Sequence, residues 1–312
     1  MNRGSEWRIW DLHVHTPLSI ENNYGCANDE EGWNKYITAL EQLPSDIKVL
    51  GINDYLFIDG YKKVKEYKDS GRLSNIELLL PVVEFRLAKF CGHKQFKRIN
   101  FHVIFSNEVS ADVIQYQFLN ALSSNYTLST DCIQQWGGVV TMENLEDLGR
   151  RIINSVPEEQ KHNYGSPLKE GFNNLNLELS QIITILNNAP QYFKGKYLTA
   201  IGKTEWDEFK WDDTSIAEKK TIINQADIVF TAAENIEKFN NAKVKLQEQN
   251  VNSLLLDCSD AHSFADTSTK DRLGNCKTWI KADPTFEGLK QIIFEPEDRV
   301  RICDSKPEYK YD

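Results

Sequence analysis

The stretch Asp11-Leu12-His13-Val14-His15-Thr16 decides how the rest of the sequence is interpreted. Apolar and polar residues alternate from Arg8 to His15, which predicts a β-strand because side chains two residues apart share a face of an extended chain. We expect one face to carry Ile9, Asp11, His13 and His15, and the other Trp10, Leu12 and Val14. Two imidazoles at i and i+2 can bind one metal ion or two neighbouring ones, because histidine is a common ligand of zinc, manganese and iron. Pairs of surface histidines share this spacing, so the motif alone is a weak signal.

Length and composition favour one globular domain covering residues 1–312. A chain of 312 residues suits a single α/β barrel, and 40% hydrophobic and 11% aromatic residues are enough for a packed core. The net charge of −10 argues against a surface that binds nucleic acid by bulk electrostatics. Basic clusters occur at Lys62/Lys63/Lys65, Lys94/Lys97/Arg98 and Arg150/Arg151. Such clusters are more typical of a solvated helix or loop face than of a binding site.

Six cysteines are scattered without a Cys-x-x-Cys spacing: Cys26, Cys91, Cys132, Cys258, Cys276 and Cys303. The first six residues are polar, unlike a signal peptide, and no apolar run approaches the roughly 18 residues that span a bilayer. These features predict reduced thiols, a cytoplasmic location and no membrane partner.

Short apolar runs alternate with longer amphipathic ones, which predicts βα units and a largely parallel sheet. Strands are expected at Ile9–His15, Lys48–Asn53, Leu78–Phe85, Asn100–Phe105, Val139–Met142, Tyr197–Gly202, Ile228–Thr231 and Ser253–Cys258. Helices are expected at Glu31–Leu43, Gly60–Ser70, Ala111–Leu122, Leu145–Asn154, Leu177–Leu186, Ile216–Gln225, Ile236–Glu248 and Pro284–Phe294. The polar, Gly- and Pro-punctuated segment 157–174 is interpreted as a loop or insertion, and 284–312 as a C-terminal helix and tail.

Metal-binding residue types recur where these strands end, which is where barrels place functional side chains. Asp54 follows the second strand, Glu84 the third, and Asp260 and His262 the last, while His102 lies among apolar residues of the fourth. Each has a structural explanation alone: a carboxylate can cap a helix, and a core histidine can be hydrogen-bonded. Four of the six histidines, however, lie in these positions or in the first motif. Together they predict a metal site at the C-terminal ends of the strands.

The order of these motifs resembles that of the PHP (polymerase and histidinol phosphatase) superfamily. The resemblance rests on residues 11–16, Asn53-Asp54-Tyr55, Glu84, His102 and Ser259-Asp260-Ala261-His262. It implies an α/β fold, a distorted (β/α)7 barrel, and metal-dependent phosphoesterase activity. Residues 4–7, 58–61 and 279–289 resemble the PHP module of TrlF-type proteins, in which an ABC/AAA-like ATPase region follows. That likeness implies an ATPase partner, in the same chain or in trans.

The resemblance also implies a ligand set. His13, His15 and Asp260 with Glu84 would form one metal position, and Glu84 would bridge to a second position that includes His102. Asp54 and His262 would be ligands or would orient ligands, and the catalytic group would be Asp54, Glu84, Asp260 and His262. Two or three divalent ions are expected, of zinc, manganese or iron, with magnesium as an alternative.

Two departures from the superfamily pattern bear on the third metal. Tyr55 stands where the superfamily usually has histidine, and a phenol with a pKa near 10 is a poor metal ligand. No residue clearly matches the His or Cys usually found between His102 and Asp260, although Glu205 or His162 are candidates. The run Gly202-Lys203-Thr204 lacks the first glycine of a phosphate-binding loop, so it predicts no ATP site. Lys203 is a candidate phosphate contact.

The function predicted from the sequence is hydrolysis of DNA or RNA phosphodiesters by a metal-activated water. A small-molecule phosphatase is the alternative enzyme, because the same metal ligands serve both reactions. A non-catalytic interaction module for an ATPase is the alternative from another class, since Tyr55 is the kind of change that disables a site.

Overall fold

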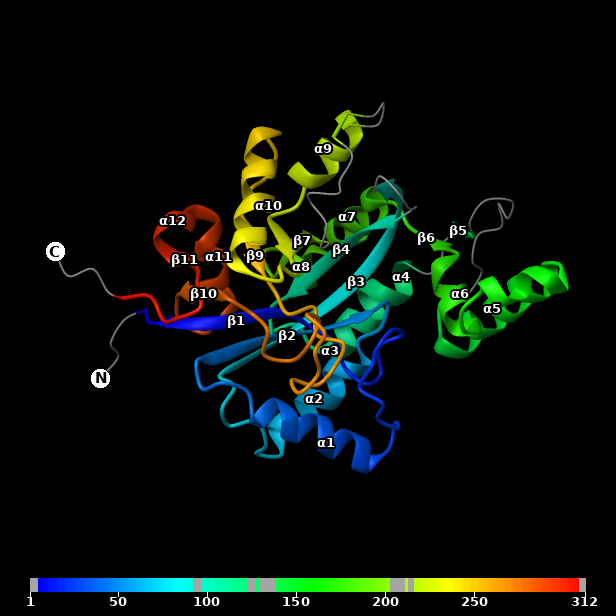
Figure 1. Cartoon of the computed structure of the whole chain (residues 1–312), viewed down its shortest axis with the longest axis horizontal. Helices are drawn as coiled ribbons and strands as arrows, with labels where there is room; N and C mark the ends of the chain where they lie inside the picture. The colour runs from blue at the N-terminus through cyan, green and yellow to red at the C-terminus, as the bar shows by residue number, and fades with distance from the viewer. Residues whose placement is uncertain are drawn as a thin grey trace.

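Seven strands form a nearly closed barrel at the centre of the molecule (Figure 1). The computed structural model describes residues 5–91, 97–122, 127–128, 139–202, 211–212 and 216–308. Around the barrel the strands are β1 (Trp7–Val14), β2 (Ile47–Tyr55), β3 (Leu78–Cys91), β4 (Lys97–Phe105), β7 (Tyr197–Gly202), β8 (Ile228–Thr231) and β9 (Leu255–Asp257). Neighbours are parallel, except that β4 runs antiparallel to β3 and β7. Ala261, shortly after β9, pairs with Val14 and closes the barrel. The predicted distorted seven-stranded α/β barrel is confirmed.

Two further strands that the sequence did not predict extend the sheet beyond β1. β10 (Thr278–Lys281) pairs antiparallel with β1, and β11 (Val300–Ile302) pairs with β10. Helices α11 (Phe286–Phe294) and α12 (Pro296–Arg299) lie between them in the chain. The predicted C-terminal helix is therefore present, but the segment after it returns to the sheet.

The barrel interior is apolar over most of its depth. Every barrel strand contributes to one core cluster, and α11 adds three side chains to it. The strand residues in this cluster include Trp10, Leu12, Val49, Leu80, Val82, Ile104, Leu198, Ala200, Ile228, Phe230 and Leu256. The described polar residues on the same inward faces include Asn53, Glu84 and His102, and they lie at the end of the barrel where β2 and β9 finish.

A bulge in β1 changes the predicted facing of the first motif. Asp11 pairs with Leu50 but Val14 pairs with Ile52, so β1 carries one extra residue between these two pairs. Trp10 and Leu12 lie in the interior core, and His13 also faces the interior, where it contacts Glu84. The expectation that Trp10 and Leu12 lie opposite His13 was wrong, because the bulge reverses the alternation.

Helices cover the outside of the barrel in the order that the sequence predicts. They are α1 (Glu30–Glu41), α2 (Asp59–Asp69), α7 (Leu179–Asn188), α8 (Pro190–Phe193), α9 (Ile216–Asn224) and α10 (Ile236–Glu248). The helix expected at 111–122 consists of α3 (Ala111–Val113), a π-helical stretch (Ile114–Leu119) and α4 (Asn120–Leu122). Their apolar faces and the outer faces of the strands share a second core cluster.

Between β4 and β7, one predicted strand is absent, and the segment predicted as a loop or insertion contains helices. Val139–Met142 forms no strand; α5 (Met142–Ser155) begins there, capped by reciprocal hydrogen bonds between Thr141 and Asn144. Segment 157–174 is no irregular loop, because it contains a 3₁₀ helix (Glu158–Asn163) and α6 (Pro167–Asn173). Ser166 caps α6 and Pro167 occupies its first turn, so the residues that suggested a loop start a helix.

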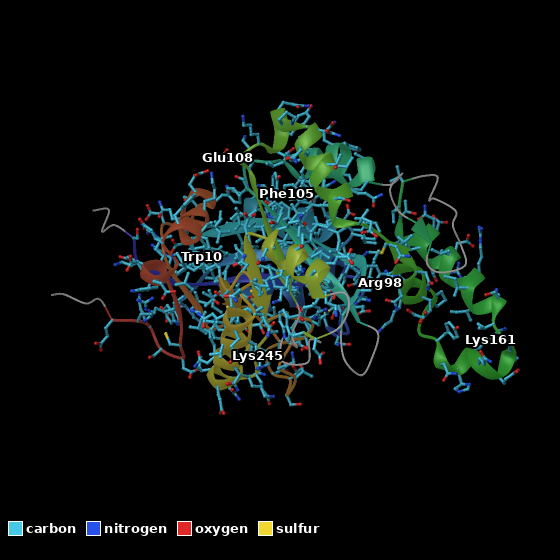
Figure 2. The ribbon with its side chains drawn as sticks, turned by 90° about the horizontal axis from the view of Figure 1, so that it is seen from above. Trp10, Arg98, Phe105, Glu108, Lys161 and Lys245 are labelled. Atoms are coloured by element: carbon cyan, nitrogen blue, oxygen red, sulfur yellow. The ribbon has the colours of Figure 1, made fainter. Side chains whose placement is uncertain are left out.

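Helices α5 and α6 form an arm, residues 142–173, that extends from the barrel (Figure 1), with Lys161 near its far end (Figure 2). A Cβ atom on Gly149 would lie 1.7 Å from the Pro167 carbonyl oxygen, and one on Gly171 would lie 1.9 Å from the Leu145 carbonyl oxygen. The two backbones therefore touch, and glycine is required at both positions. Strands β5 (Thr127–Leu128) and β6 (Leu175–Asn176) pair near the base of the arm.

No helix in the described ranges is long and apolar enough to cross a membrane. The described cysteine thiols, those of Cys26, Cys258, Cys276 and Cys303, are free, as expected. The side chains of Cys91 and Cys132 lie outside the described part of the chain.

Candidate metal centre

Five of the predicted ligands meet at the open end of the barrel. We call them the metal-centre cluster: His13, His15, Glu84, His102 and Asp260. The Nε2 atom of His13 lies 3.1 Å from Glu84 Oε2, 3.0 Å from Asp260 Oδ1 and 3.1 Å from His15 Nε2. Two sets of three residues are close enough to share an ion: His13, Glu84 and His102, and His13, His15 and Asp260. His13 belongs to both sets, so the cluster is continuous.

The reversed strand β4 places His102 in the cluster. Glu84 and His102 are directly paired across the antiparallel β3–β4 ladder, and His102 Nε2 lies 3.4 Å from Glu84 Oε2. A Cβ atom on Gly202 of β7 would lie 3.4 Å from His102 Cε1 and 2.8 Å from Phe230 Cβ. Glycine at position 202 therefore leaves room for Phe230, whose ring lies 5.2 Å from that of His102, centroid to centroid.

A strained turn presents Asp260. Its φ of +46° lies in the left-handed region, which aspartate tolerates better than most residues. The backbone N–H of Ser259, one residue earlier, donates to Asp11 Oδ1 at 3.0 Å. The side chain of Asp11, the first residue of the motif, thus anchors the turn that carries a ligand at the other end of the chain.

Asp54 lies beside the cluster and braces it. Its Oδ1 accepts from the Thr16 backbone N–H at 2.9 Å, and its Oδ2 accepts from the Thr16 hydroxyl at 2.7 Å. Its Oδ1 lies 3.8 Å from His15 Nδ1, and Ser19 Oγ lies closer to that atom, at 3.0 Å. Burial raises the pKa of Asp54 to about 6, although the Thr16 donors oppose the shift. Its predicted role as a ligand remains a prediction.

His262 and Tyr55 form the rim of the cluster. The ring of His262 lies 4.0 Å from that of His15, centroid to centroid, and Tyr55 stacks on His15 at 4.8 Å. The Tyr55 hydroxyl is 3.4 Å from His262 Nε2. Burial, with the charges of Glu84 and Asp260, raises the pKa of Tyr55 well above its usual value. Tyr55 is therefore a neutral phenol that can hydrogen-bond but is a poor metal ligand.

The electrostatics of the cluster call for positive charge. Although burial opposes it, His102 and His13 hold the pKa of Glu84 well below its usual range, and His13 does the same to Asp260. Burial acts against the charged form of His13 too, yet Asp260 and Glu84 raise its pKa to about 10. Burial and the nearby His262 lower the pKa of His15 to about 3. Burial also lowers the pKa of His102. Two carboxylates thus face imidazoles of which two are neutral.

The cluster fits a divalent cation. Buried atoms without a hydrogen-bond partner among the described residues include both ring nitrogens of His102, Glu84 Oε1 and Asn53 Oδ1. Leaving such groups unpaired costs free energy, so each calls for an explanation such as an ion or water. Neutral imidazole and carboxylate are the donor set that zinc, manganese and iron accept. His13, whose pKa Asp260 and Glu84 raise, would lose its proton when the ion binds. The residues that would hold the ion are the five of the metal-centre cluster.

Two neighbouring residues had no predicted role. Asn53 is fully buried, and its Nδ2 donates to Glu84 Oε2 at 2.8 Å. Arg86 lies over the Tyr55 ring at 5.2 Å and pairs with Glu21 at 3.2 Å. Strand alternation was the available signal, because Asn53 shares an inward face with Val49, and Arg86 shares one with Glu84.

Two of the three basic clusters noted in the sequence are paired with carboxylates. Each lysine of the α2 lysine patch (Lys62, Lys63 and Lys65) has a carboxylate partner: Asp112 at 3.1 Å, Glu66 at 3.1 Å and Asp69 at 2.6 Å, respectively. Arg150 and Arg151 pair with Glu146 and Asp147 on α5. His162 is exposed on the arm and joins no metal group among the described residues. Lys94, Lys203 and Glu205 lie outside the described residues, as does the side chain of Lys97.

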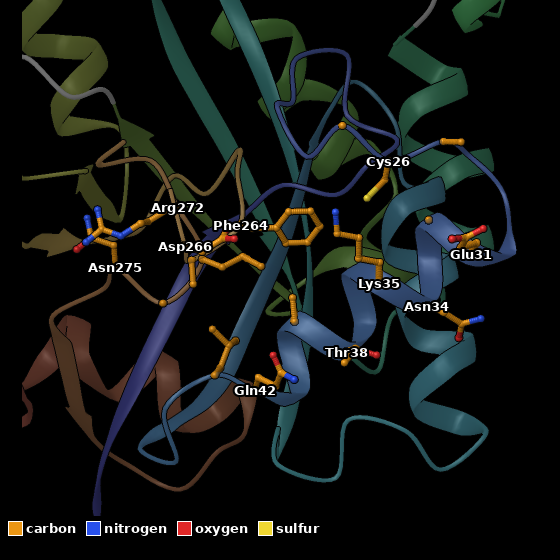
Figure 3. A pocket seen from close by; sticks show the side chains of 18 of the residues that line it. Cys26, Glu31, Asn34, Lys35, Thr38, Gln42, Phe264, Asp266, Arg272 and Asn275 are labelled. Carbon is orange, nitrogen blue, oxygen red and sulfur yellow. The ribbon is translucent and has the colours of Figure 1, made fainter. Parts of the chain in front are cut away.

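A large cavity of about 1120 Å³ lies between α1 and the loop 264–275 (Figure 3). The Lys35 ammonium lies 4.7 Å from the centroid of the Phe264 ring. The charged residues that line this cavity are Asp29, Glu31, Asp266, Lys35 and Arg272. No residue of the metal-centre cluster lines it. A separate narrow cavity, which His13, Asn100 and Asp260 line, adjoins the cluster. The large cavity is therefore separate from the metal-centre cluster.

No family model and no curated protein matches the sequence. Among solved structures, an amidohydrolase from Chromobacterium violaceum with bound sulfate and no metal is similar, with 9% identity and a TM-score of 0.45 over 94% of this chain and 98% of that chain. A candidate metal-dependent phosphoesterase from Bifidobacterium adolescentis has 12% identity and a TM-score of 0.41 over 92% of this chain and 96% of that chain. The chemistry of the centre therefore has to be inferred from its own residues.

Proposed function

We propose that this chain is a metal-dependent phosphoesterase. The observation that carries the proposal is the convergence of three imidazoles and two carboxylates on the inward face of the barrel, with buried nitrogen and oxygen atoms left unpaired among the described residues. Apolar side chains fill the rest of the barrel, so this polar cluster is an exception within an apolar interior. Buried polar clusters of this kind are characteristic of functional sites.

The residues of the metal-centre cluster and its rim would have different roles in the reaction. A divalent cation bound there would supply Lewis-acid chemistry, lowering the pKa of a water molecule and withdrawing charge from a phosphoryl oxygen. Glu84 and Asp260 stay ionised because their pKa values lie well below the usual range. His15 and His102 stay neutral and keep a lone pair available, since burial lowers both pKa values. The His262 ring, near His15 at the rim, is placed to exchange a proton with a substrate oxygen.

Arg86 would bind the phosphoryl group. It lies on β3 two residues after Glu84, and its side chain is 17% exposed. Asn173 accepts a hydrogen bond from Arg86 Nη1 at 2.6 Å, and Glu21 pairs with Nη2, so the guanidinium is held in one place. A fixed guanidinium suits an oxyanion because its donors are already oriented.

Nuclease activity, which the sequence predicts, is a more specific case of the proposed phosphoesterase activity. Basic residues near the open end of the barrel would be needed to steer a polynucleotide, and each lysine of the α2 lysine patch is paired with a carboxylate. The geometry therefore favours phosphoester hydrolysis without favouring a polynucleotide. Partnership with an ATPase and a cytoplasmic location rest on the sequence alone and remain predictions.

The test uses purified protein stripped of metal by a chelator and reloaded with zinc, manganese, iron or magnesium. Each form is assayed on a chromogenic phosphomonoester, a chromogenic phosphodiester, and labelled DNA and RNA, with Asp260→Ala as the blank. We expect metal-dependent hydrolysis of at least one phosphoester that Asp260→Ala abolishes. Cleavage of DNA or RNA that weakens steeply with salt would establish the nuclease form, because each neutralised phosphate releases counterions. Metal binding without any turnover would favour the non-catalytic module.

A further inference from the structure

Asn53 is a polar residue in the metal centre, and its contact with Glu84 explains why an asparagine lies there. It lies near the end of β2 and is fully buried. Its side-chain nitrogen is 2.8 Å from Glu84 Oε2 and 3.5 Å from His15 Nε2. A carboxylate oxygen only accepts hydrogen bonds, so the atom of Asn53 that touches Glu84 must be the amide NH₂. This contact therefore determines which way the amide points.

The contact selects one oxygen of Glu84. Four nitrogen atoms surround Oε2: those of Asn53 at 2.8 Å, His13 at 3.1 Å, His102 at 3.4 Å and His15 at 3.5 Å. The other oxygen, Oε1, is buried and has no hydrogen-bond partner within the described ranges. The shortest of the four contacts is the one to the amide. Asn53 is thus the group best placed to fix the rotation of the carboxylate.

The amide oxygen of Asn53 is also buried without a described partner. A purely structural residue at this place would be apolar, as Val49 is at an inward position earlier on β2. An unpaired buried amide oxygen costs free energy, and the position tolerates that cost beside a carboxylate and three imidazoles.

We infer that Asn53 is a positioning residue of the metal centre, which orients the Glu84 carboxylate and thereby sets the affinity of the cluster for a divalent cation. The inference rests on the proposed metal centre but is independent of the substrate. Groups that orient metal ligands typically change metal affinity by about 10- to 100-fold when they are removed.

Two variants test the inference in opposite directions. Asn53→Ala removes the donor, and the Kd for manganese or zinc should rise about 10- to 100-fold. Asn53→Asp has nearly the same size but places a second carboxylate against Glu84. The repulsion should lower the melting temperature of the metal-free protein, and a divalent cation should restore more stability than it gives the wild type.

The control is Asn252→Ala. Asn252 is partly buried, whereas Asn53 is fully buried. Its side chain makes two hydrogen bonds with the backbone, to Ala226 O at 2.6 Å and from the Leu254 N–H at 3.0 Å, and neither involves the cluster. We expect this variant to lower stability while leaving metal affinity unchanged. The visible spectrum of the cobalt-loaded protein should change in both Asn53 variants and not in Asn252→Ala.

The measurements are metal titration against a competing chelator, thermal unfolding with and without metal, and the cobalt spectrum. Equal metal affinity and an unchanged spectrum in both Asn53 variants would overturn the inference while leaving the metal centre intact. A wild-type protein that binds no metal would instead overturn the metal centre itself. If Asn53→Ala does not fold, Asn53→Asp still tests the inference. A purely structural role for Asn53 does not predict that a divalent cation stabilises this variant more than it stabilises the wild type.

Discussion

The metal-centre cluster and the α2 lysine patch are both rich in charge, and they differ in how that charge is balanced. On α2 each lysine reaches a carboxylate, and the partners are largely exposed, with side-chain exposures of 63–74%. In the barrel, Glu84 and His102 are fully buried and still leave oxygen and nitrogen atoms unpaired among the described residues. Exposed charges are solvated whether or not they pair, so their arrangement says little about function. Buried groups without partners must be explained, and the proposed metal ion would explain them.

The first prediction compares the same substitution in both regions. Glu84→Gln keeps the shape of the side chain but removes the charge at the centre of the cluster, whereas Glu66→Gln removes a partner of Lys63 on α2. We expect Glu84→Gln to lower kcat/KM for a phosphoester by about 10²- to 10³-fold, as losses of key electrostatic groups do. Glu66→Gln should change it less than about twofold. Steady-state kinetics and elemental analysis of both proteins measure the difference, and equal effects would remove the distinction between the regions.

The second prediction separates a ligand from a brace. Asp54→Asn keeps an oxygen for the Thr16 N–H and gains an NH₂ that can donate to the Thr16 hydroxyl, so both hydrogen bonds survive. If Asp54 only braces the cluster, metal affinity should change by no more than about 10- to 100-fold. A loss comparable to that in Glu84→Gln would make Asp54 a ligand. Competitive chelator titration distinguishes the two.

The third prediction concerns stability. A ligand that binds only the folded state at 100 times its Kd adds about 2.7 kcal/mol to the free energy of unfolding. For a chain of this size that corresponds to a rise in melting temperature of roughly 5 °C. Zinc or manganese should produce this rise in the wild type and in Glu66→Gln, and a chelator should reverse it. Glu84→Gln should show little rise; an undiminished one would place the ion elsewhere.

The fourth prediction concerns Asp257, a buried carboxylate in which each oxygen accepts a hydrogen bond. Asp257 accepts from the Ala233 N–H at 3.1 Å and the Lys277 N–H at 2.8 Å, and burial raises its pKa to about 7. The folded state therefore holds a proton that the unfolded state releases near pH 4. This contribution to stability is complete below pH 4 and is lost as pH rises through 7.

Asp257→Asn should remove that pH dependence. The free energy of unfolding of the wild type, minus that of the variant, should fall between pH 4 and 7 by up to about 1.4 kcal/mol per pH unit and be level above. Urea unfolding of metal-free protein across this range measures it. A difference that rises with pH would mean that Asp257 is stabilised as the anion, like Glu84.

The barrel and the cluster follow from the sequence where signals are local and repeated. Helix α10 begins and ends where the periodicity predicts, and Glu84 closes an apolar run that needs no tertiary context. The bulge in β1 depends on pairing with β2, so alternation alone placed Trp10 on the wrong face. Strand β10 has four residues and gains its order from β1. Such features belong to tertiary pairing rather than to local pattern.

Residues that act through another residue were not predicted from the sequence either. Asn53 directly precedes Asp54, and the carboxylate was the predicted site residue because carboxylates ligate metals. Strand alternation assigns the inward position to Asn53, whereas Asp54 reaches back to Thr16. Similarly, Ser166 and Pro167 looked like loop punctuation, because the same residue types end one element and start the next.

The smallest effect is expected from the α2 lysine patch. Replacing Lys62, Lys63 and Lys65 by Gln removes three exposed ion pairs, each worth about 0.2–1 kcal/mol at most. Because these lysines already face carboxylates, we expect less than about a twofold change in kcat/KM on every phosphoester tested. If a polynucleotide instead runs over this patch, KM for DNA or RNA should rise, and the slope of log affinity against log salt should fall by about 0.9 for each phosphate that the variant no longer neutralises. A salt series on DNA, RNA and a phosphomonoester with the triple variant separates these outcomes. A reduced slope confined to nucleic acid would show that the patch binds substrate despite its carboxylate partners. The α2 lysine patch and the metal-centre cluster would then not differ in function in the way that their charge pairing suggests.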